Sequence, residues 1–118
     1  MLTKAVRLYG ANDLRVEKFE LPEIGENEVL IKVVSDSLCA STYKAVIQGT
    51  AHKRVPENIA QNPVIIGHEM CGTVVKAGAD VADKWKVGQN IVIQPALKLD
   101  NGHDPGYSYQ YIGGNSIY

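Results

Sequence analysis

The stretch from Ile65 to Val81, IIGHEMCGTVVKAGADV, decides the fold prediction and holds the first chemistry-bearing side chains. Apolar, β-branched residues on both sides of His68 and Glu69 predict two strands, and Gly67 marks a break between them. Adjacent side chains on a regular strand point to opposite faces of a sheet. His68 and Glu69 can therefore face one ion only if the backbone departs from strand geometry, which Gly67 permits.

Short β-type runs separated by turn residues make up most of the sequence, at a spacing typical of barrels and sandwiches. The predicted strands are KAVRLY (4–9), DLRVEKFEL (13–21), EVLIKVV (28–34), PVIIG (63–67), GTVVKAG (72–78) and NIVIQPAL (90–97). Because EVLIKVV is apolar on both faces, we expect a central strand there. A short helix is predicted over Ser41–Gln48, because this segment begins with hydroxyl residues and is followed by Gly49. The polar stretch 50–63 is interpreted as a surface loop.

Length and composition predict one soluble, cytoplasmic domain. The 118 residues, 45% hydrophobic and 21% charged, fit one hydrophobic core. A formal net charge of −1 from interspersed acids and bases argues against nucleic acid or an anionic membrane as partner. The two cysteines are too few for a secreted disulfide framework, and the N-terminus lacks the apolar core of a signal peptide. No apolar run approaches the roughly 20 residues of a membrane-spanning helix.

Cys39 lies just past the end of one predicted strand, and His68 lies just past the end of another. Thiolate, imidazole and carboxylate are ligands of Zn²⁺, and a catalytic zinc uses three protein ligands and one open position. Three such ligands would be supplied by Cys39, His68 and Glu69. On spacing alone the plainer alternative is favoured, with Cys39 as a small buried residue, His68 hydrogen-bonded and Glu69 exposed. A peptidase motif is excluded because Gly72 stands where H-E-x-x-H requires its second histidine.

Three motifs together carry a resemblance to a known family over essentially the whole chain, 1–118. They are SLCAST (37–42), PVIIGHEMCGTVVKAGADV (63–81) and KVGQNIVIQP (86–95). The chain resembles the N-terminal catalytic domain of the zinc-dependent medium-chain alcohol and polyol dehydrogenases. The resemblance implies a mostly β fold, a GroES-like, partly open β-barrel with one or two short helices.

The resemblance also implies roles for individual residues. In that family the matching cysteine and histidine bind the catalytic zinc, which implies Cys39 and His68 as ligands. The adjacent glutamate either joins the coordination, as in the polyol branch, or lies beside the metal while a ligand from a later segment completes it. The polyol branch implies Glu69 as the third ligand. Ser41 resembles the hydroxyl that takes the substrate's proton into a relay, so Ser41 and Glu69 are the catalytic candidates. The alternative for Ser41 is a helix cap. Zinc would polarise the substrate oxygen, and NAD or NADP would exchange the hydride.

The stretch STYKAVIQGTAHKRVP (41–56) is similar to sorbitol and sorbose-phosphate reductases. This similarity implies a small alcohol, polyol or ketose as substrate, and Lys53 and Arg54 would suit a phosphorylated one. No glycines form G-x-G-x-x-G, so we expect the coenzyme-binding Rossmann domain to be absent from this chain. NAD or NADP would bind mainly to that domain of a homo-oligomeric full-length enzyme, and the fragment would be inactive alone.

The sequence departs from the family at two places. Thr42 stands where the family usually has an aspartate that orients the zinc-bound histidine. The segment KLDNGHDPGYSYQYIGG (98–114) has no cysteine, which excludes a four-cysteine structural zinc there. Cys71 is interpreted as a core-packing residue.

Two alternatives to a zinc dehydrogenase stay open. One is a non-catalytic GroES-like co-chaperonin or binding module, whose ring assembly has no use for Cys39, His68 and Glu69. The other is a zinc-independent reductase of the same superfamily, which would keep its activity after mutation of Cys39.

Overall fold

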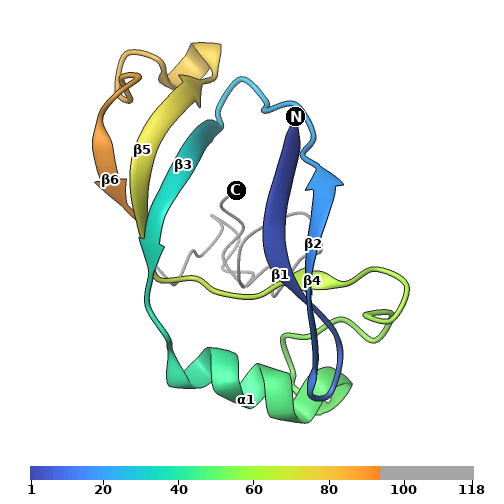
Figure 1. Ribbon diagram of the computed structural model, residues 1–118. Coiled ribbons are helices and arrows are strands. Elements are labelled where there is room, and N and C mark those ends of the chain that lie inside the picture. The colour runs from blue at the N-terminus through green and yellow to red at the C-terminus, as the bar shows by residue number, and fades with distance from the viewer. Residues whose placement is uncertain (94–118) are drawn as a thin grey trace.

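The computed structural model describes residues 1–93, and the strands within this range form two antiparallel sheets (Figure 1). The first sheet has the order β2-β1-β4 and consists of β1 (Leu2–Gly10), β2 (Asp13–Glu20) and β4 (Val64–Ile65). The second has the order β3-β5-β6 and consists of β3 (Val29–Asp36), β5 (Met70–Ala77) and β6 (Asn90–Val92). The chain crosses between the sheets after β2, after β3 and after β4. The last of these crossings contains His68 and Glu69.

Helix α1 (Ala40–Gln48) connects β3 to the segment that leads to β4, and it confirms the predicted helix with one residue more at its start. Two short 3₁₀ turns follow elsewhere, η1 (Gly49–Ala51) and η2 (Ala79–Val81). Gly49 ends α1 with a φ of 54°, and a Cβ at this position would lie 2.7 Å from the backbone nitrogen of Ala11. Glycine is therefore required both by the backbone conformation and by the close approach of the β1–β2 turn.

The expectation that residues 28–34 form a central strand is wrong for the part of the chain that the structure describes. β3 lies at the edge of its sheet and β5 lies in the centre. Only Ile31 of β3 is buried, and Val34 is 71% exposed. Apolar residues on both faces of a strand show that both faces could be buried. The position of the strand in the sheet is decided by its pairing with other strands.

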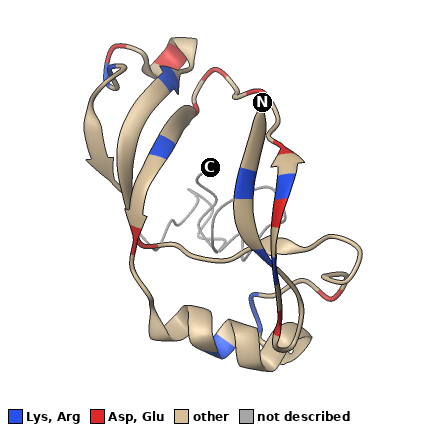
Figure 2. Ribbon diagram, viewed as in Figure 1, with Lys and Arg blue, Asp and Glu red and all other residues tan. Residues whose placement is uncertain are grey.

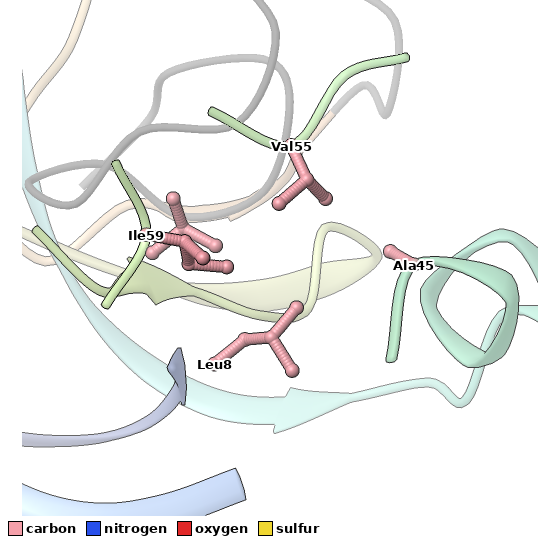
Figure 3. Close-up of a cluster of buried hydrophobic side chains, with 5 residues drawn as sticks. Leu8, Ala45, Val55 and Ile59 are labelled. Atoms are coloured by element: carbon pink, nitrogen blue, oxygen red, sulfur yellow. The ribbon is translucent and has the colours of Figure 1, made fainter. Parts of the chain in front are cut away.

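Within residues 1–93, most of the buried apolar side chains fall into two separate clusters. The first consists of Leu8, Ala45, Val55, Ile59 and Val64, and Figure 3 shows how β1, α1 and the loop before β4 contribute to it. The second consists of Ile31, Met70 and Val74, from β3 and β5. The interpretation of 50–63 as a surface loop is wrong at three positions, since Val55 and Ile59 are 6% and 2% exposed and Pro63 is also buried. The side chains of Val55 and Ile59 fix the loop against β1 and α1.

The fold prediction is confirmed in class: the protein is mostly β, and in residues 1–93 the two sheets do not close into a barrel. Acidic and basic residues are interspersed over the described elements (Figure 2). None of the described helices is both long and apolar enough to cross a membrane. The cysteine-free segment 98–114 lies outside the described residues.

Candidate metal centre

Cys39 lies between the end of β3 and the start of α1, where it is the N-cap residue of the helix. Its backbone is extended, with φ −92° and ψ 141°, and its carbonyl oxygen accepts a hydrogen bond from the Tyr43 N–H at 3.3 Å. Its side chain makes no capping bond to the helix. The start of α1 therefore fixes the position of Cys39, while its half-buried thiol makes no hydrogen bond that caps the helix.

His68 and Glu69 lie in the segment between β4 and β5, where strand geometry is interrupted as predicted. β4 ends at Ile65 and β5 begins at Met70, and Gly67 between them has a φ of 112°. L-amino acids other than glycine rarely adopt this conformation. His68 is 5% exposed, and in residues 1–93 it is the one buried residue with a polar or charged side chain. Glu69 is half-buried.

The structure brings the three predicted ligands together. One ligand atom from each of Cys39, His68 and Glu69 lies within 4.8 Å of the other two. Ser41 belongs to the same group, because its Oγ lies 3.0 Å from Cys39 Sγ and 3.1 Å from His68 Nε2. The Ser41 side chain therefore contacts the candidate ligands and does not cap α1, which has no side-chain cap.

These residues fit a zinc ion. Thiolate, imidazole and carboxylate are all zinc ligands, and ligand atoms around a tetrahedral zinc are about 3.5 Å apart at ordinary bond lengths. The observed spread of 4.8 Å is slightly wider, so small side-chain rotations would bring the three atoms into bonding distance. Cys39 and Glu69 are only partly buried, which leaves a side of the group open for a fourth ligand. Three protein ligands with an open position are typical of catalytic zinc.

Residues around this group differ from the sequence expectations in detail. Among residues 1–93, the buried hydroxyl of Thr42 has no hydrogen-bond partner, so it does not take over the role of the aspartate it replaces. Cys71 is half-buried rather than a core residue, and its Sγ lies 3.1 Å from Ser35 Oγ. Sequence reasoning missed Asp36, whose Oδ1 accepts a hydrogen bond from the Glu69 N–H at 3.1 Å. The available signal was an acid at the end of the strand that leads to Cys39.

His52 lies in the loop after α1 and is partly buried. The Arg54 N–H donates a hydrogen bond to its Nδ1 at 3.2 Å. Burial is the main cause that lowers the pKa of His52 below 6.5, and the positive charges of Arg54, Lys53 and Lys44 lower it further. This loop therefore gathers basic side chains close to one another.

Known proteins are similar to this chain over most of its length. Residues 25–115 match the family described as the alcohol dehydrogenase GroES-like domain. The chain is 47% identical over 98% of its length to the mannitol-1-phosphate 5-dehydrogenase of Aliivibrio fischeri, and 47% identical over 98% to the L-sorbose 1-phosphate reductase of Klebsiella pneumoniae. It covers 27% and 28% of these two relatives, so it spans little more than a quarter of their length.

A solved structure gives the same relationship. The galactitol-1-phosphate dehydrogenase of Escherichia coli superposes with a TM-score of 0.67 and 28% identity, over 81% of this chain and 25% of that protein. The family match covers well over half of the chain, and the two relatives exceed 30% identity over nearly all of it. The chain therefore belongs to the alcohol dehydrogenase GroES-like domain family.

Proposed function

We propose that residues 1–118 form the zinc- and substrate-binding domain of an NAD(P)-linked alcohol or polyol dehydrogenase, with Cys39, His68 and Glu69 as the zinc ligands. The observation that carries this proposal is the convergence of a thiol, an imidazole and a carboxylate within 4.8 Å. Cys39 comes from the start of α1, and the other two come from the segment between β4 and β5. Such a donor set from distant parts of a chain is typical of a metal centre rather than of core packing.

Ser41 is proposed to move the proton of the substrate hydroxyl. A serine hydroxyl can both donate and accept a hydrogen bond, so it can accept one proton while it releases another. Ser41 Oγ already lies 3.1 Å from His68 Nε2 and 3.0 Å from Cys39 Sγ, beside the proposed zinc position. Bound zinc supplies Lewis acidity, which lowers the pKa of an alcohol and polarises a carbonyl. Glu69 would add a negative charge that holds the ion.

The hydride requires a nicotinamide cofactor, because no side chain of the chain performs hydride transfer. We place NAD or NADP mainly on a nucleotide-binding domain elsewhere in the full-length protein. Two facts support this: the sequence 1–118 contains no G-x-G-x-x-G, and the chain covers 27% and 28% of two dehydrogenase relatives. We propose that the full-length enzyme is a homo-oligomer. We place it in the cytoplasm, since Cys39 and Cys71 are both free.

The proposed substrate is a polyol or the corresponding ketose, in phosphorylated form. The names of the two relatives and of the structural neighbour all contain a sugar or polyol phosphate. Lys53 and Arg54 supply positive charge on the loop after α1, as phosphate binding requires. Activity of the full-length protein should therefore be higher with mannitol 1-phosphate or sorbose 1-phosphate than with mannitol or sorbose.

Zinc content and turnover of the full-length protein test the proposal. Cys39→Ser should lose one equivalent of zinc by elemental analysis and nearly all NAD(P)-dependent turnover of polyol phosphates. Cys71→Ser is the matched control, because Cys71 is also a free, half-buried cysteine but lies outside the ligand group, and it should keep both. A Cys39→Ser enzyme with normal activity would instead favour a zinc-independent reductase. A metal-free ring without turnover would favour the co-chaperonin alternative.

A further inference from the structure

The end of β3 holds Glu69 by its backbone on both sides. The Glu69 N–H donates a hydrogen bond to Asp36 Oδ1 at 3.1 Å, and the Glu69 carbonyl oxygen accepts one from the Ser37 N–H at 3.0 Å. The backbone of Glu69 is thus held in place, and a carboxylate oxygen of Glu69 lies within 4.8 Å of the ligand atoms of Cys39 and His68. Figure 1 shows that the end of β3 and the start of β5 run side by side at this point, and Asp36 pairs with Met70 in the sheet.

The second oxygen of the same carboxylate lies against Gly67. A Cβ at Gly67 would run into Asp36 Oδ2, so the carboxylate occupies the space that the glycine leaves. Asp36 therefore contacts both ends of the short segment Gly67–Glu69: one oxygen lies beside Gly67 and the other is bonded to the Glu69 N–H. His68 lies between these two contacts.

The pairing of β3 with β5 explains how Asp36 reaches this position. The register shifts between Val33, which pairs with Gly72, and Ser35, which pairs with Cys71, so Val34 is an extra residue on β3. An extra residue of this kind bends a strand and redirects the residues that follow it. Here those residues are Asp36 and, after the strand, Cys39.

We infer that Asp36 is a positioning residue for the metal centre: its carboxylate holds the segment Gly67–Glu69 so that His68 and Glu69 face Cys39. The inference rests on the proposed zinc site. It assigns to a residue of β3 the outer contact that fixes ligand orientation, a role that Thr42 does not fill because its hydroxyl makes no hydrogen bond within residues 1–93. Residues that hold metal ligands in place without binding the metal themselves contribute roughly 10- to 100-fold to metal affinity.

Metal affinity of the full-length protein tests the inference. Asp36→Ala should weaken zinc binding about tenfold in a competition titration with a chelating dye, at the low end of the range because Asp36 is exposed. Asp36→Asn should restore affinity to within about threefold of wild type, because its side-chain oxygen accepts the same bond. Ser37→Ala is the control and should bind zinc normally, since the shorter of its two bonds to Glu69 comes from the backbone.

The visible spectrum of the cobalt-substituted protein separates positioning from general loss of structure. If Asp36 fixes ligand orientation, the d–d bands of bound Co²⁺ should shift in Asp36→Ala and return in Asp36→Asn, while the metal-free proteins melt at similar temperatures in EDTA. An unchanged zinc affinity in Asp36→Ala would overturn the inference. So would an Asp36→Asn variant as weak as Asp36→Ala, or a loss of affinity matched by an equal loss of metal-free stability.

A double-mutant cycle supplies a second, independent test. Gly67→Ala should weaken zinc binding in wild type, but by a smaller factor in the Asp36→Ala background, where the carboxylate that its Cβ meets is absent. Strictly additive losses would overturn the inference. Failure of this inference leaves the proposed function intact if Cys39→Ser still loses its zinc. If the wild-type protein binds no zinc at all, both are overturned.

Discussion

At the scale of single residues, the position of Ser41 is the most specific chemical information in the site. A serine in the first turn of a helix is ordinarily explained by local backbone bonding. Here Cys39 is the N-cap, no side chain caps α1, and Ser41 Oγ contacts the thiol and the imidazole instead. This arrangement argues against capping as the function of the hydroxyl, and it supports the proposed role of Ser41 in proton transfer.

Replacing this hydroxyl should therefore affect catalysis more than metal binding. We expect Ser41→Ala in the full-length enzyme to lower kcat about 100-fold, at the lower end of the range for general acid–base groups, with zinc content unchanged. Ser41→Thr keeps the hydroxyl and should recover most of the rate. Steady-state kinetics and elemental analysis measure both quantities. A Ser41→Ala enzyme that has lost its zinc would show that Ser41 positions the zinc ligands and does not transfer the proton.

His52 gives a prediction about pH. Its pKa is lowered, first by burial and then by nearby positive charges, so its NMR titration midpoint in the folded protein should lie below 6.5. Between the lowered pKa and the unfolded value the unfolded chain binds more protons, so stability rises with pH across this interval. The His52 contribution is fully present above pH 6.5 and is lost as the pH falls through the folded pKa.

The same titration tests the proposed phosphate subsite. A sugar phosphate bound at Lys53 and Arg54 would offset the charges that lower the pKa of His52, so the midpoint should rise when the ligand is added. The unphosphorylated sugar is the control and should leave the midpoint unchanged. A midpoint at or above 6.5 without ligand would contradict the lowered pKa, and an unchanged midpoint with ligand would place the phosphate elsewhere.

At the scale of elements, the pairing of β3 with β5 depends on Gly72. A Cβ at Gly72 would run into the carbonyl oxygen of Lys32 and lie 3.3 Å from the Cα of Val33. The obstacle is backbone, which cannot rotate away as a side chain could. We expect Gly72→Ala to lower the free energy of unfolding by about 2 kcal/mol, as overpacking does.

Gly10→Ala is the matched control for this change, because nothing lies within 4 Å of a Cβ there and Gly10 has no positive φ. Its effect should stay within about 0.5 kcal/mol. Urea denaturation of both variants measures the difference. Equal stability of Gly72→Ala and wild type would mean that β3 and β5 can separate without cost at this point.

The elements themselves could be predicted largely from the sequence, and the errors have a common cause. Periodicity and turn residues are local signals, and within residues 1–93 they placed α1 and the strands within a few residues of their observed bounds. Residues 94–97 of the predicted strand 90–97 lie outside the described residues. Whether β3 lies at an edge, and whether Val55 and Ile59 are buried, depends on which distant segments pack beside them. Asp36 was missed for the same reason, since its contacts with Gly67 and Glu69 cross from one strand to another segment.

At the scale of the whole molecule, the candidate metal centre is built from segments that lead into two different packing clusters. Cys39 and Ser41 belong to the start of α1, which packs through Ala45 into the cluster of Leu8. His68 and Glu69 lead into β5, which packs through Met70 and Val74 into the cluster of Ile31. Spacing alone could not predict this convergence and favoured the plainer alternative, whereas the family resemblance selected the residues that the structure brings together.

A site that joins two clusters couples metal binding to the stability of the fold. A ligand that binds only the folded state stabilises it by RT ln(1 + [L]/Kd), about 4 kcal/mol when free zinc exceeds Kd a thousandfold. Adding zinc to the metal-free full-length protein should therefore raise its melting temperature by several degrees in differential scanning calorimetry. Cys39→Ser should show no zinc-dependent rise, and Cys71→Ser should show the wild-type rise. Identical melting with and without zinc would mean that the ion does not link α1 to the segment before β5, and that the two clusters hold the three side chains together unaided.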